Sequence, residues 1–239
     1  MLSLGQMYSN NLKPSLHFGG NRPTLHLNAI QDNKLEYANK DEYPRLFEFL
    51  TSDCTPIATP RRSYPRHQFN FMKAECGRLK NNNKIRKSNS PWRAQAVVVS
   101  NSDGEDRMVV DYSGTINKYT RLDSYPLPKI DNIVNEVAKF KYISKLDLKS
   151  AYHQVKLHPD DIPYTAFQVG NELYEWLVMP FGITNAVPIF QRISNDFVDK
   201  NNLQGYVFPY LDDWAVGGNT PEEHDYYLNK TLAAAKEDV

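Results

Sequence analysis

The sequence has little cysteine, no long hydrophobic run and no excess of charge of either sign. Its two cysteines, Cys54 and Cys76, are 22 residues apart and form no C-x-x-C pair. A disulfide framework and a zinc site are therefore excluded, and a reducing compartment is indicated. No stretch approaches the roughly 18 apolar residues that span a membrane, and the first residues lack the layout of a signal peptide. We therefore expect an intracellular protein with no membrane partner.

The net charge of zero, from 28 Lys and Arg against 28 Asp and Glu, conceals an uneven distribution. Residues 61–93 contain ten Lys and Arg and one acid, whereas residues 194–239 contain nine Asp and Glu and three Lys or Arg. This pattern suits a chain that holds a polyanion at one place and a metal at another. Two solvated surfaces explain the same distribution equally well.

The 239 residues are enough for one large domain or two small ones. Residues 1–45 are rich in Asn, Gly, Pro and His without a sustained hydrophobic period, which predicts an extended connector. We expect the folded region to cover residues 46–239.

Hydrophobic periodicity in the folded region predicts hairpins and helices. The β-branched runs 97–99 and 108–110 flank turn-forming residues 101–104 and predict a hairpin. Apolar residues recur at i, i+3, i+4 and i+7 from Ile130, and four apart after Pro188, which predicts two amphipathic helices.

Three further elements complete the pattern. Residues 142–148 read as a strand in which Leu146 and Asp147 face opposite sides. A helix is expected to begin after Thr220 as N-cap, with Pro221 at its first position. Because hairpins and helices mix without strict alternation of strand and helix, the fold class is α+β.

Two adjacent acids, Asp212 and Asp213, lie between the apolar runs 207–210 and 214–216 of a predicted hairpin. Adjacent carboxylates repel, and an unpaired buried charge costs several kcal/mol, so a cation is needed nearby. Magnesium is the natural choice because it prefers carboxylate and phosphate oxygens. Two ions about 3.5–4 Å apart need a further acid, for which Asp147 is the candidate. An ordinary solvent-exposed turn is the alternative.

Ordered motifs at these residues resemble the reverse transcriptases of gypsy-type LTR retrotransposons. Residues 146–154 resemble motif A of that family, and Tyr210-Leu211-Asp212-Asp213 resembles its Y-x-D-D box. Residues 1–45 resemble the linker between protease and polymerase in such polyproteins. The remaining matches are motif B at 179–186 and 190–192, and the fingers pattern at 88–93, 107–112 and 125–128.

The resemblance implies the fingers and palm of a right-hand polymerase, with an antiparallel palm sheet packed on helices and the thumb absent. It implies an RNA-directed DNA polymerase that joins dNTPs to a primer 3′-hydroxyl with two Mg²⁺ ions, which Mn²⁺ can replace. The implied partners are an RNA or DNA template-primer, dNTPs, and the thumb, RNase H and integrase domains of a longer Pol polyprotein. The implied location is the cytoplasm or a virus-like particle.

The resemblance also assigns site residues. Tyr152 becomes a steric gate against the ribose 2′-hydroxyl, and Arg107 a grip on the triphosphate, with a strand-edge surface charge as its alternative. Trp92 contacts the template or packs in the core. The metal ligands are Asp147, Asp212, Asp213 and the Leu148 carbonyl; the nucleotide-binding residues are Arg107, Ser150, Ala151, Tyr152, Phe181 and Gly182; the template and primer contacts are Trp92, Arg93, Gln191 and Tyr210.

The chain departs from the family at Trp214, which replaces a small aliphatic residue and is expected to crowd the metal site. Without the thumb, we expect poor polymerisation by the chain alone. The alternative function is an inactive truncated or domesticated remnant that binds nucleic acid or a protein. An RNA-dependent RNA polymerase is disfavoured, because Tyr152 fills the gate position and Tyr210 begins a box in which those enzymes carry Gly before the acids.

Overall fold

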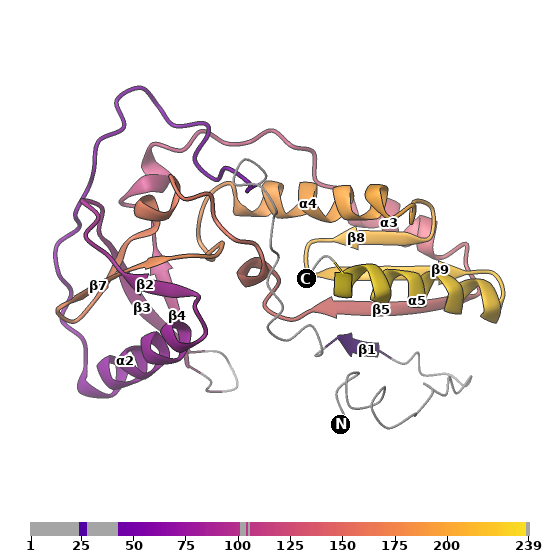
Figure 1. Ribbon diagram of the computed structural model, residues 1–239, viewed down its shortest axis with the longest axis horizontal. Helices are drawn as coiled ribbons and strands as arrows, with labels where there is room; N and C mark the ends of the chain where they lie inside the picture. The colour runs from indigo at the N-terminus through magenta and orange to yellow at the C-terminus, as the bar shows by residue number, and fades with distance from the viewer. Residues whose placement is uncertain (1–23, 28–42, 101–103, 105, 238–239) are drawn as a thin grey trace. The chain divides into compact units, whose positions relative to one another are not determined.

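The computed structural model describes residues 24–27, 43–100, 104 and 106–237, with residues 24–27 and 236–237 described by their backbone. The chain divides into two compact units, which we name after their sheets (Figure 1). The four-stranded unit comprises residues 1–36, 125–151 and 190–239. The five-stranded unit comprises residues 37–124 and 152–189.

The sheet of the four-stranded unit has the order β1-β5-β9-β8. Its strands are β1 (Thr24–Leu27), β5 (Tyr142–Leu148), β8 (Val207–Tyr210) and β9 (Asp213–Gly218). Strand β9 pairs antiparallel with both β5 and β8, and the predicted β8–β9 hairpin is confirmed.

Strand β1 was not expected, because its segment shows no hydrophobic period. It pairs parallel with β5, so that Leu25 lies opposite Leu146 and Leu27 opposite Leu148. The predicted connector therefore contributes a short strand to the edge of this sheet. Residues 1–23 and 28–42 of the connector lie outside the described residues.

The helices of this unit are α3 (Ile130–Val137), α4 (Ala186–Lys200), whose first residues belong to the other unit, and α5 (Pro221–Glu237). Each confirms a predicted helix. The Thr220 hydroxyl accepts a hydrogen bond from the Glu223 amide at 3.2 Å, which caps α5. In Figure 1, α5 lies along β9.

One face of the four-stranded sheet packs on α4 and α5 and forms the core of the unit. Alternation along β5 and β9 places every second side chain on this face. Burying such apolar side chains stabilises the fold by roughly 1.5–3 kcal/mol each. The core residues are Leu146, Val198, Leu203, Val207, Trp214, Val216, Leu228 and Leu232.

The sheet of the five-stranded unit has the order β2-β7-β6-β3-β4. Its strands are β2 (Ile85–Lys87), β3 (Ala94–Ser100), β4 (Asp106–Asp111), β6 (Phe167–Val169) and β7 (Glu172–Trp176). The antiparallel β3–β4 pair confirms the predicted hairpin.

Other elements of the five-stranded unit were not predicted. Helix α2 (Arg66–Asn81) buries Met72, Cys76 and Leu79 and packs on β2, β3 and β6. Short 3₁₀ helices follow at η2 (Ile116–Lys118), η3 (Ala151–Gln154), whose first residue belongs to the other unit, and η4 (Ile162–Thr165).

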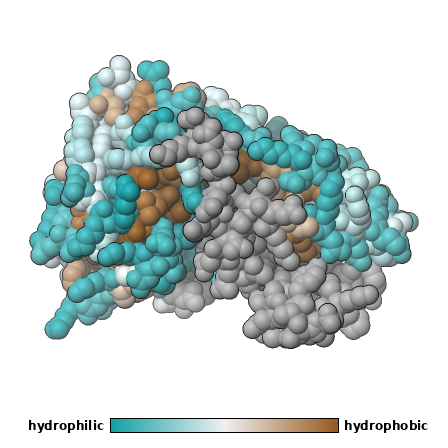
Figure 2. All heavy atoms as spheres, in the orientation of Figure 1, coloured by the Kyte–Doolittle hydropathy of each residue, from teal (hydrophilic) through white to brown (hydrophobic). Residues whose placement is uncertain are grey.

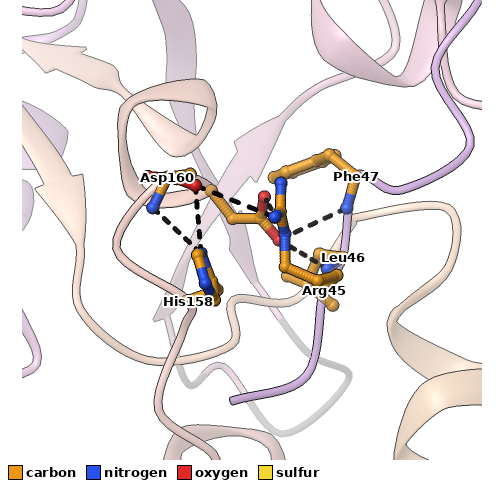
Figure 3. Close-up of polar contacts among 6 residues, drawn as sticks. Arg45, Leu46, Phe47, His158 and Asp160 are labelled. Carbon is orange, nitrogen blue, oxygen red and sulfur yellow. Dashed lines mark hydrogen bonds and ion pairs between the residues drawn. The ribbon is translucent and has the colours of Figure 1, made fainter. Parts of the chain in front are cut away.

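A buried carboxylate ties the start of the five-stranded unit to the loop before η4. Asp161 is fully buried and accepts hydrogen bonds from Arg45 Nε at 3.1 Å and the Leu46 amide at 2.7 Å. Burial raises the pKa of Asp161, and the Arg45 charge opposes this shift. Figure 3 shows Arg45, Leu46 and Phe47 beside Asp160, to which Arg45 also forms an ion pair at 3.7 Å.

The visible surface is mainly hydrophilic, and hydrophobic side chains gather in smaller patches (Figure 2). Among the residues that the structure describes, no helix is both long and apolar enough to cross a membrane.

Candidate active site

The register of β5 and β9 brings two of the predicted carboxylates together. Asp147 is paired directly with Asp213 across the two strands, and Leu146 with Trp214. Because opposite residues of an antiparallel pair share a face, Asp147 and Asp213 lie on the face opposite the core. Leu146 and Trp214, which are 1% and 5% exposed, lie in the core.

The third carboxylate sits in the tight turn between β8 and β9. Leu211 and Asp212 form this turn, and Leu211 has the left-handed φ of +52°. The Asp212 carbonyl accepts a hydrogen bond from the Leu148 amide at 2.9 Å, which ties the turn to the end of β5. Asp212 itself is exposed, so its side chain is open to a ligand.

The side chain of Gln191 fixes this turn through hydrogen bonds. Its side chain is fully buried, donates to the Pro209 carbonyl at 3.0 Å and accepts from the Leu211 amide at 2.9 Å. Two hydrogen bonds to the backbone on either side of Tyr210 compensate for an uncommon backbone conformation. These contacts fix the backbone of the turn, and the predicted contact of Gln191 with template or primer remains a prediction.

Lys145 is the charged neighbour that the sequence analysis missed. It lies two residues before Asp147 on the same face of β5, and its Nζ forms an ion pair with Asp213 Oδ1 at 2.8 Å. The Asp213 hydrogen bond raises the pKa of Lys145, with smaller contributions from the charges of Asp213, Asp147 and Asp212. The alternation of strand residues could have identified Lys145, because positions i and i+2 share a face.

The donor atoms suit a hard divalent cation. Asp147, Asp212 and Asp213 offer carboxylate oxygens only, which are the ligands that Mg²⁺ and Mn²⁺ prefer. Within the described part of the chain, however, no three His, Cys, Asp or Glu side chains lie close enough together to hold a metal ion. The three acids therefore fit a divalent cation by the chemistry of their donor atoms, and Lys145 is paired to one of them.

Trp214 does not crowd the carboxylates, which corrects the sequence-based expectation. Its side chain points into the core, where it packs against Phe197 with ring centroids 5.0 Å apart. Its indole N–H donates to the Leu211 carbonyl at 3.0 Å. Trp214 therefore supports the turn from the core side of the sheet.

Several predicted nucleotide-binding residues gather in the five-stranded unit. The rings of Tyr152 and Phe181 have centroids 5.0 Å apart, and Phe181 is 51% exposed. Gly182 has a φ of +87°, and a Cβ there would lie 3.0 Å from the Val110 carbonyl oxygen. Its own carbonyl accepts from Asn117 Nδ2 at 2.7 Å. This position requires glycine for both its conformation and its close approach to the backbone.

The positions of the other predicted nucleotide-binding residues do not distinguish nucleotide binding from other roles. Arg107 is exposed on β4, which is an edge strand, so the surface-charge alternative fits its position as well. In the four-stranded unit, Ser150 is exposed with a φ of +52°, whereas Ala151 is buried. Their predicted roles remain predictions.

The predicted template contacts differ in accessibility. Trp92 is 3% exposed and packs edge-on against Tyr119 and Tyr164, which agrees with its packing alternative. Arg93 is half-buried and donates from Nε to the Thr59 carbonyl at 3.0 Å. In the four-stranded unit, the half-buried Tyr210 pairs with Asp213 across the β8–β9 hairpin.

Comparisons with known proteins agree with this arrangement. The sequence profile of the family described as "Reverse transcriptase (RNA-dependent DNA polymerase)" matches residues 85–238. The chain is 33% identical over 219 residues to polyprotein P3 of Commelina yellow mottle virus, covering 87% of this chain and 12% of the polyprotein. It is 32% identical over 191 residues to the retrovirus-related Pol polyprotein of transposon gypsy from Drosophila melanogaster. This match covers 76% of this chain and 18% of that polyprotein.

The fold is also that of a solved reverse transcriptase. The foamy viral protease-reverse transcriptase in complex with an RNA/DNA hybrid superposes with a TM-score of 0.72 at 22% identity. The match covers 82% of this chain and 26% of that one. The chain thus spans a minor part of each of the relatives that it matches.

Proposed function

Because the chain belongs to the reverse transcriptase (RNA-dependent DNA polymerase) family, we propose that it is the catalytic core of an RNA-directed DNA polymerase. The observation that carries this proposal is the pairing of Asp147 with Asp213 beside the turn that displays Asp212. In the proposed organisation, residues 46–239 are the fingers and palm, and residues 1–45 are the connector. The relatives are polyproteins of viruses and a transposon, which supports a place in the cytoplasm or a virus-like particle.

The carboxylate face would hold two Mg²⁺ or Mn²⁺ ions through Asp147, Asp212, Asp213 and the Leu148 carbonyl. When bound, the ions would lower the pKa of the primer 3′-hydroxyl and neutralise charge on the triphosphate and the departing pyrophosphate. Packing of Leu146 in the core orients β5 and would thereby hold Asp147, the next residue, in position for a metal ion.

Residues of the five-stranded unit would select and hold the incoming dNTP. Arg107 would bind its phosphates, and Tyr152 would exclude a ribose 2′-hydroxyl by its bulk. Phe181, whose ring contacts that of Tyr152, and Gly182 would line the pocket of the new base pair. In the four-stranded unit, Ser150 and Ala151 are further proposed nucleotide contacts. The remaining proposed partners are an RNA or DNA template-primer and the other domains of a Pol polyprotein.

Primer extension on an RNA template with Mg²⁺ and dNTPs tests the carboxylate site. We expect incorporation by the parent chain and its loss in Asp147→Asn and Asp212→Asn, because neutral amides hold divalent cations weakly. Asp196→Asn is the matched control, since Asp196 is an exposed acid of the same unit outside this face. Circular dichroism and urea unfolding verify that each variant is folded.

The possible outcomes separate the two functions. Equal activity of the parent and both aspartate variants would refute the site. A folded parent without incorporation, even when supplied with Mn²⁺, would instead favour the inactive remnant that binds nucleic acid.

The gate assignment has its own test. In Tyr152→Val we expect ribonucleotide incorporation to rise relative to deoxynucleotide incorporation, because the bulk at the gate is lost. Tyr152→Phe keeps that bulk and should retain the parent's discrimination. If the valine variant discriminates as the parent does, the gate lies elsewhere.

A further inference from the structure

A cavity of about 380 Å³ lies in the five-stranded unit, in a size range typical of small-molecule sites. Its walls come from the loop before α2, from α2 itself and from the turn between β6 and β7. The lining residues are Arg61, Arg62, Ser63, Tyr64, Phe69 and Gly170. None of them belongs to the candidate active site described above.

The loop wall is fixed to strand β3. The Tyr64 hydroxyl donates to the Ala96 carbonyl at 2.6 Å, and the Arg62 amide donates to Gln95 Oε1 at 3.3 Å. Gln95 is 6% exposed, so this anchor is shielded from solvent. The cavity is therefore bounded by a segment with a defined backbone position.

Gly170 shapes the opposite wall of the cavity. Gly170 has a φ of +62°, and a Cβ there would lie 2.6 Å from the Phe69 ring. Its carbonyl accepts a hydrogen bond from Gln168 Nε2 at 2.7 Å, which fixes the turn. The absence of a side chain at Gly170 thus makes room for the aromatic ring at the cavity.

The charge of the cavity is positive. Arg61 and Arg62 are exposed, no acid lines the cavity, and within the described residues neither guanidinium has an ion-pair partner. Arg62 contributes to lowering the pKa of Asp111, but the hydroxyl and amide of Ser113 contribute more and occupy that carboxylate.

The N-terminus of α2 adds to this positive potential. No side chain caps the helix at Pro65, and no acid lies in its first turn. The free amides of the first turn and the helix dipole favour an anion.

We propose that this cavity binds one nucleotide unit, with Arg61 and Arg62 on its phosphate and the Phe69 and Tyr64 rings against its base. Arginine grips phosphate oxygens, and aromatic rings stack on any base. The unit is part of a single strand or a free nucleoside triphosphate. This inference deepens the proposed function by naming a second nucleotide contact, and it requires neither a metal nor catalysis.

Fluorescence anisotropy of the full chain in EDTA tests the proposal, with a labelled oligothymidylate of about ten nucleotides as the probe. We expect Arg62→Gln to weaken binding about tenfold, because it removes a charged hydrogen bond to phosphate. Phe69→Leu should weaken it about fivefold through lost stacking. Lys73→Gln is the matched control, since Lys73 is exposed on α2 outside the cavity, and its effect should be under threefold.

Photocrosslinking locates the contact independently of folding effects. A 5-iodouracil in the oligomer should crosslink to Tyr64 or Phe69, identified by mass spectrometry. Competition by dTTP at equal phosphate concentration would assign the cavity to free nucleotides, and its failure would assign it to a strand. Equal weakening by Arg62→Gln and Lys73→Gln, with no crosslink to the lining residues, would overturn the proposal.

The test is separable from that of the proposed function. Asp212→Asn should bind the oligomer as the parent does, because Asp212 is not a lining residue. Loss of polymerase activity with intact binding, or the reverse, therefore identifies which of the two proposals fails.

Discussion

At the scale of single residues, His153 carries the clearest dependence on pH. Its ring is half-buried and stacks on Trp176 with centroids 5.0 Å apart. Burial, assisted by the Lys84 charge, lowers the pKa of His153 from 6.5 to about 4. Within the described residues, its buried Nε2 also lacks a hydrogen-bond partner. The neutral imidazole is thus the form that the folded chain favours.

The sign of the effect follows from the folded pKa being lower than the unfolded one. Between pH 6.5 and about 4 the unfolded chain binds more protons, so stability falls as the pH falls. Because a shift of one pKa unit corresponds to 1.36 kcal/mol, His153 accounts for at most about 3 kcal/mol of this loss of stability.

Urea unfolding from pH 7 to pH 4 measures this contribution. We expect His153→Phe, which keeps an aromatic ring but cannot be protonated, to lose less stability than the parent over this range. His67→Phe is the control, because His67 is exposed on α2. If the unfolding free energy of His153→Phe fell with pH as steeply as that of the parent, protonation of His153 would not be the cause of the loss.

At the scale of elements, the β8–β9 hairpin depends on a helix that lies outside it. Gln191 of α4 donates to Pro209 and accepts from Leu211. In Gln191→Leu the buried Pro209 carbonyl loses this partner at a cost of about 1–3 kcal/mol, and the half-buried Leu211 amide loses it at a smaller cost. We therefore expect a loss of about 2–4 kcal/mol of stability and of most polymerase activity, because the Asp212 turn is no longer fixed.

Hydrogen exchange distinguishes this local effect from general destabilisation. The Leu211 amide should exchange much faster in Gln191→Leu than in the parent, at a pH where both are folded. Gln204→Leu, at an exposed position of the same unit, should leave that amide protected. Protection that persists in Gln191→Leu would contradict the positioning role.

The carboxylate face of β5 and β9 gives a second prediction at this scale. Lys145 pairs with Asp213 and also acts on Asp147 and Asp212, so it competes with a divalent cation for the same acids. We expect Lys145→Gln to bind Mn²⁺ several-fold more tightly in a calorimetric titration, since it removes a positive charge within a few ångströms.

Lys141→Gln is the matched control for the lysine substitution. Lys141 is exposed just before β5, and among the described residues it forms no ion pair with the three acids. Weaker Mn²⁺ binding in Lys145→Gln than in the control would mean that Lys145 organises the acids for the metal.

Elements with a strong period could be predicted, and elements defined by distant partners could not. Alternation placed β5 at Tyr142–Leu148, and the Thr220 cap placed the start of α5. Helix α2 escaped because its buried residues, Met72, Cys76 and Leu79, lie among Lys, Arg and Asn that suggested only a charged segment. Strand β1 has four residues and pairs with a strand far along the chain, which no local pattern reveals.

The same distinction applies to the site. Motifs were enough to select Asp147, Asp212 and Asp213, because their residue types and order suggest the chemistry. Burial was not predictable for Gln191, since the side of α4 that faces the hairpin depends on packing. The expectation that Trp214 crowds the metal site was wrong because neighbouring residues of β9 face opposite sides of the sheet, so Trp214 lies in the core and Asp213 does not.

At the scale of the whole molecule, the two charged segments belong to different units. Residues 61–93 lie in the five-stranded unit, and residues 194–239 lie in the four-stranded unit. The exposed basic side chains of the first segment include Arg66 and Lys80, while Arg78 is paired with Glu75. Polyanion binding is therefore expected to depend on the five-stranded unit.

Salt titration of single-stranded RNA binding tests this dependence. Each neutralised phosphate of a single strand contributes about −0.7 to the slope of log K against log salt. Four contacts made by the basic segment would thus give a slope of about −3, which is roughly an eightfold loss of affinity when the salt doubles. The double variant Arg66→Gln and Lys80→Gln should reduce the slope in magnitude by up to about 1.4.

Lys200→Gln controls for the loss of charge itself, because Lys200 is exposed within the acidic segment. It should leave the slope unchanged, since repulsion by the surrounding acids keeps that segment away from phosphates. A flat salt response of the parent would mean that the basic segment is merely solvated. A slope that falls equally in the double variant and in Lys200→Gln would place the phosphate contacts on both units.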